Sequence, residues 1–154
     1  MKRVSLFVFA FLMILGAFPL LAQENYTEGA VTRVSHIRIT PGRATEFWAD
    51  VRQNVKPIYE EYKKAGIITN YSFYTKVTAE SAEDWNVGVR IDYANYAALD
   101  GLAARTDPIT LKFYGSREAR TAAGIRRLEN SRTTSSVLVR QIDPKPMPPA
   151  TPRP

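Results

Sequence analysis

The residues of this sequence that are best suited to chemistry are one histidine, one tyrosine and three arginines. His36 is the only histidine in the 154-residue chain, and a histidine can exchange a proton near neutral pH. Arginines can hold a carboxylate or an enolate through paired hydrogen bonds. His36 and Tyr74 are therefore the candidate catalytic residues, and the candidate ligand-binding residues are Arg38, Arg90 and Arg140.

Each of these residues also has a structural interpretation. The arginines could pair with Asp92 and with carboxylates of a second chain, and His36 could be a hydrogen-bonded histidine of a core or an interface. Four aromatic side chains could stack on a flat ligand, although such residues more often form a core: Trp48, Tyr71, Tyr74 and Trp85. The arginines between residues 117 and 132 could bind anions or form a solvated, ion-paired face.

The composition excludes several kinds of chemistry. The chain has no cysteine, which rules out a thiol nucleophile and disulfide bonds. One histidine is too few for the common zinc sites. The sequence also contains neither a phosphate-binding loop nor a glycine-rich dinucleotide fingerprint. We therefore expect no metal and no cofactor.

An apolar run near the N-terminus predicts export. Lys2 and Arg3 precede this run, which extends from residue 4 to residue 21 and ends at Ala22 before polar residues. This is the pattern of a secretory signal peptide over residues 1–22. The alternative is a retained membrane anchor, because about eighteen apolar residues are near the minimum that spans a bilayer. We expect an exported, periplasmic or secreted protein with no membrane partner after cleavage.

The net charge of the exported chain indicates the class of partner. The formal net charge is +6 and falls by two with the loss of Lys2 and Arg3, so the exported chain would suit an anionic small molecule better than a nucleic acid.

After the signal peptide, the chain divides into a polar leader over residues 23–29, one domain over 30–142 and a tail over 143–154. The tail contains six prolines, so we expect it to be polyproline-like and disordered. The alternative is that the tail docks a partner.

The best-marked element is a helix after the first extended segment. Thr40-Pro41 predicts its start as a hydroxyl cap followed by proline at the first helical position. Apolar residues then recur every three or four positions from 44 to 65, and Gly66 ends the helix. Pro57 removes one backbone hydrogen bond inside this pattern, which predicts a kink near residues 53–54.

The other segments complete a β-α-β-β-α-β order. Extended segments are predicted over residues 30–39, 67–77, 85–92 and 135–142. In the third of these, Trp85, Val87 and Val89 should face the helices. Between the third and fourth, the sequence predicts a helix capped by Asp92 and a second helix that starts at Asp107-Pro108. The fold class is therefore α+β, a ferredoxin-like sandwich with strand order 4-1-3-2 and helices on one face of the sheet.

Several of these features are similar to those of one superfamily. They are the strand-to-helix passage at residues 36–42, the pairs Phe47-Trp48 and Lys56-Pro57, Gly66, and the strand at 85–91 that runs into Asp92-Tyr93. Over residues 30–142 the chain resembles the dimeric α/β-barrel superfamily, which includes antibiotic-biosynthesis monooxygenase-like and NIPSNAP-like domains. The resemblance implies a homodimer whose two sheets close a barrel, with ligands in clefts between sheet and helices or inside the barrel.

The physics of the sheet agrees with this implied homodimer. A sheet with helices on one side leaves Val34, Leu138 and Ile142 exposed unless a second chain covers them. Members of the superfamily carry out different reactions, so the fold does not fix the function. The haem-degrading members place a histidine ligand on a helix, whereas His36 lies on a predicted strand, which argues against haem.

Three functional hypotheses follow from the sequence. The leading one is an exported homodimer that binds a small anionic or aromatic molecule. The second is a cofactor-independent enzyme of the monooxygenase-like type, with His36 and Tyr74 as catalytic residues and Arg90 as the anion holder. The third is a non-catalytic interaction domain whose proline-rich tail docks a partner.

Overall fold

Four antiparallel strands form a single sheet in the order β2-β3-β1-β4, as the sequence predicts. The computed structural model describes residues 25–78 and 81–146. The predicted signal peptide over 1–22 lies outside these ranges, as do residues 147–154 of the predicted tail. The strands are β1 (Tyr26–Ile39), β2 (Asn70–Thr75), β3 (Val87–Tyr93) and β4 (Ser131–Pro144).

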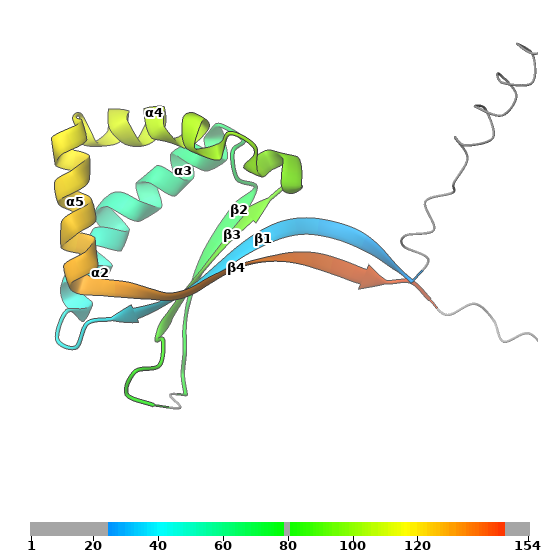
Figure 1. Cartoon of the computed structure of the whole chain (residues 1–154), viewed down its shortest axis with the longest axis horizontal. Coiled ribbons are helices and arrows are strands. Elements are labelled where there is room, and N and C mark those ends of the chain that lie inside the picture. Colours follow the sequence, from blue (N-terminus) through cyan, green and yellow to red (C-terminus); the bar gives the residue numbers. More distant parts are fainter. Residues whose placement is uncertain (1–24, 79–80, 147–154) are drawn as a thin grey trace, which may run out of the picture. The chain divides into compact units, whose positions relative to one another are not determined.

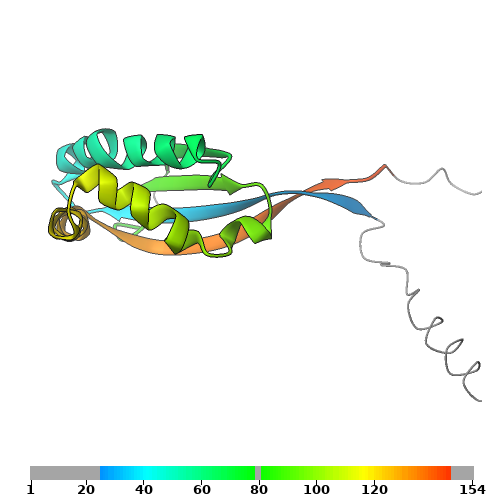
Figure 2. The same ribbon diagram turned by 90° about the horizontal axis from the view of Figure 1, so that it is seen from above.

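The helical segments lie on one side of the sheet. They are α2 (Ala44–Asp50), a π-helical segment η1 (Val51–Val55), α3 (Lys56–Lys64), a 3₁₀ segment η2 (Tyr96–Leu99), α4 (Leu102–Tyr114) and α5 (Arg117–Asn130). Figures 1 and 2 show α2 to α5 gathered over one face, while none of the helices in residues 25–78 and 81–146 covers the opposite face, called here the open face. The β-α-β-β-α-β order and the strand order together make the fold ferredoxin-like.

The chain divides into two compact units. The larger unit, Glu28–Gln141, holds the helices and most of the sheet. The other joins the two chain ends, where the Lys145 N–H donates to the Asn25 carbonyl at 2.8 Å and the Thr27 hydroxyl donates to the Asp143 carbonyl at 3.4 Å. No helix within the described ranges is long and apolar enough to span a membrane.

The strand register sorts side chains onto the two faces of the sheet. His36 of β1 and Tyr74 of β2 both lie opposite Gly88 of β3, and Val34 lies opposite Arg90. Paired residues share a face, so these side chains belong to the open face. The neighbouring residues, including Val87 and Ile91, belong to the face that the helices cover, because they pack in or against the core.

The core consists of two clusters beneath the helices. One joins Ile39, Phe47, Val51 and Val87, and the other joins Val31, Ile67, Ile68 and Tyr93. The prediction that Trp85 faces the helices is wrong. Trp85 precedes β3 and does not follow the alternation of the strand, and its ring stacks on His36 of the open face with 4.2 Å between centroids.

The predicted N-cap of the first helix is also wrong. The Thr40 hydroxyl donates to the Glu129 carbonyl at 3.0 Å, and the Thr40 carbonyl accepts from the Arg43 N–H in a turn through Gly42, at φ 78°. The helix therefore begins at Ala44. The irregularity predicted at residues 53–54 is present as the π-helical segment, in which the Lys56 N–H donates to the Val51 carbonyl five residues earlier.

The predicted division of the second helical region lies elsewhere. Helix α4 continues through Pro108 and ends at Gly115, whose φ of 79° is left-handed. The Ser116 hydroxyl then caps α5 by accepting from the Ala119 N–H at 3.1 Å. Asp92, the predicted cap, instead accepts a hydrogen bond from the Thr32 hydroxyl at 2.6 Å, and Asn95 caps η2 in its place.

Candidate functional site

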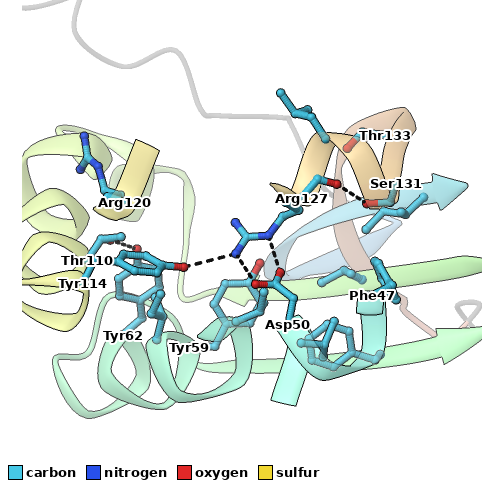
Figure 3. Close-up of a pocket in the computed structure, with 17 residues that line it drawn as sticks. Phe47, Asp50, Tyr59, Tyr62, Thr110, Tyr114, Arg120, Arg127, Ser131 and Thr133 are labelled. Atoms are coloured by element: carbon cyan, nitrogen blue, oxygen red, sulfur yellow. Dashed lines mark hydrogen bonds and ion pairs between the residues drawn. The ribbon is translucent and has the colours of Figure 1, made fainter. Parts of the chain in front are cut away.

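A cleft of about 300 Å³ lies between the helices and the covered face of the sheet, and we call it the helix–sheet cleft. Strands β1 to β4 form its floor, α2 to α3 form one wall, and α4 and α5 form the other. Most of its lining is aliphatic or aromatic: Ile37, Phe47, Val51, Val55, Ile58, Tyr59, Tyr62, Phe73, Val89, Tyr114 and Leu128. Figure 3 shows these walls converging on a few polar groups.

An ion pair joins the two walls of the helix–sheet cleft. Arg127 of α5 donates through Nε to the Asp50 carboxylate of α2, at 2.8 Å from Oδ2, and through Nη2 to the Tyr114 hydroxyl at 3.3 Å. The Asn54 amide also donates to Asp50, at 2.7 Å. Burial opposes the charge of Arg127, but hydrogen bonds to Asp50 and Tyr114 hold its pKa above the ordinary value. The group therefore stays charged and fixed in position.

Two tyrosines of α3, Tyr59 and Tyr62, also line the cleft. Burial raises the pKa of Tyr59 to about 12, despite the nearby positive charge of Arg127. Figure 3 shows Tyr59 beside the Asp50–Arg127 pair. Tyr62 shares a hydrogen bond of 2.7 Å with the Thr110 hydroxyl of α4. The Tyr59 phenol is thus neutral at physiological pH and able to donate a hydrogen bond.

The π-helical segment contributes to the lining of the cleft. It adds one residue to a helical turn, which rotates α3 by about 100° relative to the continuation of α2. As a result, Phe47 and Val51 before the irregularity and Ile58, Tyr59 and Tyr62 after it all face the same space. This arrangement suits recognition of a small apolar molecule that has one polar end.

The structure brings together the two predicted catalytic residues. The rings of His36 and Tyr74 lie edge to face with 6.4 Å between centroids, and Trp85 stacks on His36 and meets Tyr74 edge to face. His36 Nδ1 shares a hydrogen bond of 2.9 Å with the Ser135 hydroxyl. This aromatic cluster lies on the open face, on the other side of the sheet from the helix–sheet cleft.

The predicted ligand-binding arginines do not form one site. Arg90 and Arg140 line a shallow hollow of the open face together with Val34 and Val139. Arg90 donates to the Asp92 carboxylate at 2.8 Å, and Arg140 pairs with Glu28 and lies over the Tyr96 ring. Arg38 lines a separate hollow. The pairing of Arg90 with Asp92 is the structural alternative that the sequence already indicated.

Sequence reasoning missed the polar groups of the helix–sheet cleft. Asp50 follows Phe47 by three positions and precedes Val51, so a carboxylate interrupts the apolar stripe of the helix. A polar residue inside such a stripe was the available signal. Arg127 gave a weaker signal, because five arginines in its region look alike in sequence. Within the described ranges, no group of three or more His, Asp or Glu residues is placed to hold a metal ion.

Comparison with known proteins yields distant structural similarity. No family model and no curated protein matches the chain. A dimeric protein of unknown function and ferredoxin-like fold from Bacteroides fragilis is 17% identical, with 75% of this chain and 98% of that chain covered and a TM-score of 0.42. A dimeric ferredoxin-like protein from an uncultured marine organism is 11% identical, covering 75% and 95%, with a TM-score of 0.46.

A third similar structure belongs to a Jannaschia species. This dimeric ferredoxin-like protein of unknown function is 14% identical, covers 73% of this chain and 98% of its own, and has a TM-score of 0.42. Similarities at this level concern the fold alone. The function must therefore be argued from the residues of the site.

Proposed function

We propose that this protein binds a small, largely aromatic molecule in the helix–sheet cleft. The observation that carries the proposal is a space of about 300 Å³ walled by apolar and aromatic side chains around a fixed ion pair. Sites for small molecules have this composition, because apolar walls supply affinity and a few fixed polar groups supply orientation. The phenols of Tyr59 and Tyr62 offer ring faces for stacking and hydroxyls for hydrogen bonding.

The proposal includes a homodimer formed through the open face. Large apolar side chains of β4 are exposed on this face, where Val137 and Val139, two positions apart, are 48% and 44% exposed. Val139 shares its hollow with Val34, on the face that no helix covers. Burial of such a surface against a second copy would remove apolar area from water. This is the pairing expected of a dimeric α/β-barrel protein of the monooxygenase-like or NIPSNAP-like kind.

The proposed setting is an exported compartment. The signal-peptide pattern over residues 1–22 supports this location. The absence of cysteine also means that the fold depends on its packed clusters and not on disulfide bonds. Ligands available to the protein would then be small molecules that reach the periplasm or the exterior.

The cleft can be tested with the neutral aromatic probe 1-N-phenylnaphthylamine, whose fluorescence rises in apolar surroundings. The wild-type chain should bind it saturably. Thr133 is exposed on β4 and lines the cleft, so Thr133→Trp should place an indole in this space and weaken binding about tenfold or more. Thr134→Trp, at the next position and outside the lining, is the matched control and should bind like wild type.

Either of two results would refute this proposal. One is the absence of saturable binding by a folded wild-type chain. The other is equal affinity of the wild type and the Thr133→Trp variant, because the probe would then occupy another place.

A cofactor-independent monooxygenase-like activity is the second candidate, and the contact between His36 and Tyr74 favours it. In that case His36 would take a proton from an activated phenolic substrate. Oxygen uptake with 2-naphthol as the probe substrate should then be lost in His36→Ala while folding and assembly are retained. Loss of the dimer in this variant would instead identify His36 as an interface residue.

A further inference from the structure

We propose that Arg33 is the anchor for a carboxylate in a second cavity, so that the ligand of this protein is an aromatic carboxylic acid. The second cavity measures about 430 Å³ and shares Tyr59, Tyr62 and Thr133 with the helix–sheet cleft. The inference rests on the proposed function, because the aromatic body of the acid would occupy the cleft. It adds the chemical class of the ligand and the residue that recognises its charge.

Arg33 lies on the face of the sheet that the helices cover. It is opposite Ile91 in the register of β1 and β3, and Ile91 packs against the core. Arginine is rare on such a face unless it is paired. Arg33 Nε is nevertheless sealed from solvent without a hydrogen-bond partner, and Arg33 forms no ion pair with any residue in 25–78 or 81–146.

The described lining of this cavity contains no carboxylate, and carboxylates of the surrounding elements have other partners. Asp92 is on the opposite face, where Thr32 and Arg90 donate to it. The Asp50 carboxylate is held by Arg127, and Tyr71 donates to Glu60. A guanidinium that is partly buried without an anion has lost hydration without compensation. A carboxylate from outside the chain would supply the missing charge and accept its hydrogen bonds.

Uncharged donors surround Arg33 as a carboxylate site requires. Tyr59 and Tyr93 both line the cavity, and neither hydroxyl has a hydrogen-bond partner among the described residues. Burial raises the pKa of both phenols although the charge of Arg33 acts in the opposite direction. They are therefore protonated at neutral pH and can donate to the same anion that Arg33 binds.

The composition of the cavity floor also indicates a polar ligand group. Ser35 and Ser136 line it with Thr133, and the two serine hydroxyls share a hydrogen bond of 3.0 Å. A core at this place would carry aliphatic residues. The polar floor continues into the apolar helix–sheet cleft at Thr133, so the two spaces together match a molecule with an acidic end and an aromatic body.

Arg33 and Arg127 differ in what they offer a ligand. The Arg127 guanidinium is already neutralised by Asp50, at 2.8 Å between Nε and Oδ2. An incoming carboxylate would have to displace Asp50 there, whereas Arg33 requires no displacement. The acid should therefore be recognised in the second cavity and not at the ion pair of the cleft.

The test compares two probes of nearly the same shape, sodium 2-naphthoate and neutral 2-naphthamide, by calorimetric titration of the full chain. Wild type should bind the naphthoate more tightly than the amide. Arg33→Gln should weaken naphthoate binding by roughly tenfold to a hundredfold, the range of a hydrogen bond to a charged group, and should leave naphthamide affinity unchanged. Arg117→Gln, an exposed arginine outside both cavities, is the matched control.

Arg33→Lys guards against a folding defect in Arg33→Gln, because it keeps the charge and loses only the paired geometry. Arg33→Lys should bind the naphthoate with an affinity between that of the wild type and that of Arg33→Gln. Equal affinity of wild type and a folded Arg33→Gln for the naphthoate would overturn the inference, and naphthamide binding would still support the cleft. Failure of both probes to bind wild type would refute the proposed function together with the inference.

Discussion

At the scale of the residue, the covered face of the sheet contains two arginines in contrasting states. Arg127 has a carboxylate and a phenol as partners and joins the two walls of the helix–sheet cleft. Arg33 has neither, although its Nε is removed from solvent. A paired group of this kind fixes the position of protein atoms, while an unpaired one is available to a ligand. Tyr59 lines both spaces and links the two environments.

The burial of Tyr59 predicts an alkaline loss of stability. Its pKa is about 10 in the unfolded chain and about 12 in the folded protein. The folded state therefore retains the phenolic proton longer, and its stabilisation is complete below pH 10 and disappears as the pH rises from 10 to 12. The full loss should amount to about 3 kcal/mol in the free energy of unfolding, and about half of it should fall between pH 9 and pH 11.

Urea unfolding at pH 9 and pH 11 measures this effect. Tyr59→Phe, which has no phenol to ionise, should lose less stability than wild type between the two pH values. Tyr74→Phe removes an exposed phenol of the open face and should follow the wild-type loss. An equal loss in wild type and Tyr59→Phe would mean that the Tyr59 phenol is not protected in the folded protein.

At the scale of the element, two glycines make opposite contributions to the pair α4 and α5. Gly115 ends α4 at φ 79°, and a Cβ there would meet no atom within 4 Å. Gly115→Ala should therefore destabilise by about 1 kcal/mol through backbone strain alone. Gly124 lies inside α5, also with open space around it. Gly124→Ala should stabilise by about 1 kcal/mol through helix propensity.

Thermal unfolding of the two variants gives a clear comparison. The same methyl group is added in both variants, so only the local backbone differs. The midpoint temperature should fall for Gly115→Ala and rise for Gly124→Ala. A rise for both variants would contradict the left-handed end of α4. It would favour a helix that continues through Gly115 from the start that the sequence predicts at Asp107-Pro108.

The elements also show how far the sequence could be interpreted. The positions of the strands and the irregular turn near Gln53 were predictable, because period-two patterns and an internal proline are local signals. The strand order followed from the ferredoxin-like order of the elements. The helix boundary at Asp107-Pro108 was not, since α4 tolerates Pro108 and its true end depends on Gly115. Local capping rules cannot rank two such signals without knowing how α4 and α5 pack.

The same distinction applies to the candidate site. The contact of His36 with Tyr74 followed from register, which the sequence specifies through alternation. The ion pair of Asp50 with Arg127 joins residues 77 positions apart on two helices. Its formation depends on the angle and spacing of those helices, which no local pattern encodes. The unpaired state of Arg33 likewise requires knowing what surrounds it.

At the scale of the whole molecule, the two faces of the sheet differ in what they carry. The covered face holds the cavities, and the open face carries exposed apolar side chains and the aromatic cluster. The proposed homodimer predicts that Val139→Lys, in the hollow beside Val34, converts dimer to monomer. A charge buried without a partner at an interface costs several kcal/mol.

Light scattering coupled to size-exclusion chromatography reports this conversion. Val77→Lys is the control, because Val77 is 95% exposed and lies beyond the end of β2. It should remain dimeric. Dimers in both variants would place the interface on another surface, and a monomeric wild type would exclude the homodimer.

If the helix–sheet cleft holds a small aromatic molecule, native mass spectrometry should detect that molecule on the protein. The full chain and the Thr133→Trp variant would be purified from the same host under identical conditions without added ligand. A reproducible small-molecule adduct is expected on the wild type, and it should be reduced or lost in the variant. An adduct of equal abundance on both chains, or a wild type that carries none even after incubation with 2-naphthamide, would contradict this expectation.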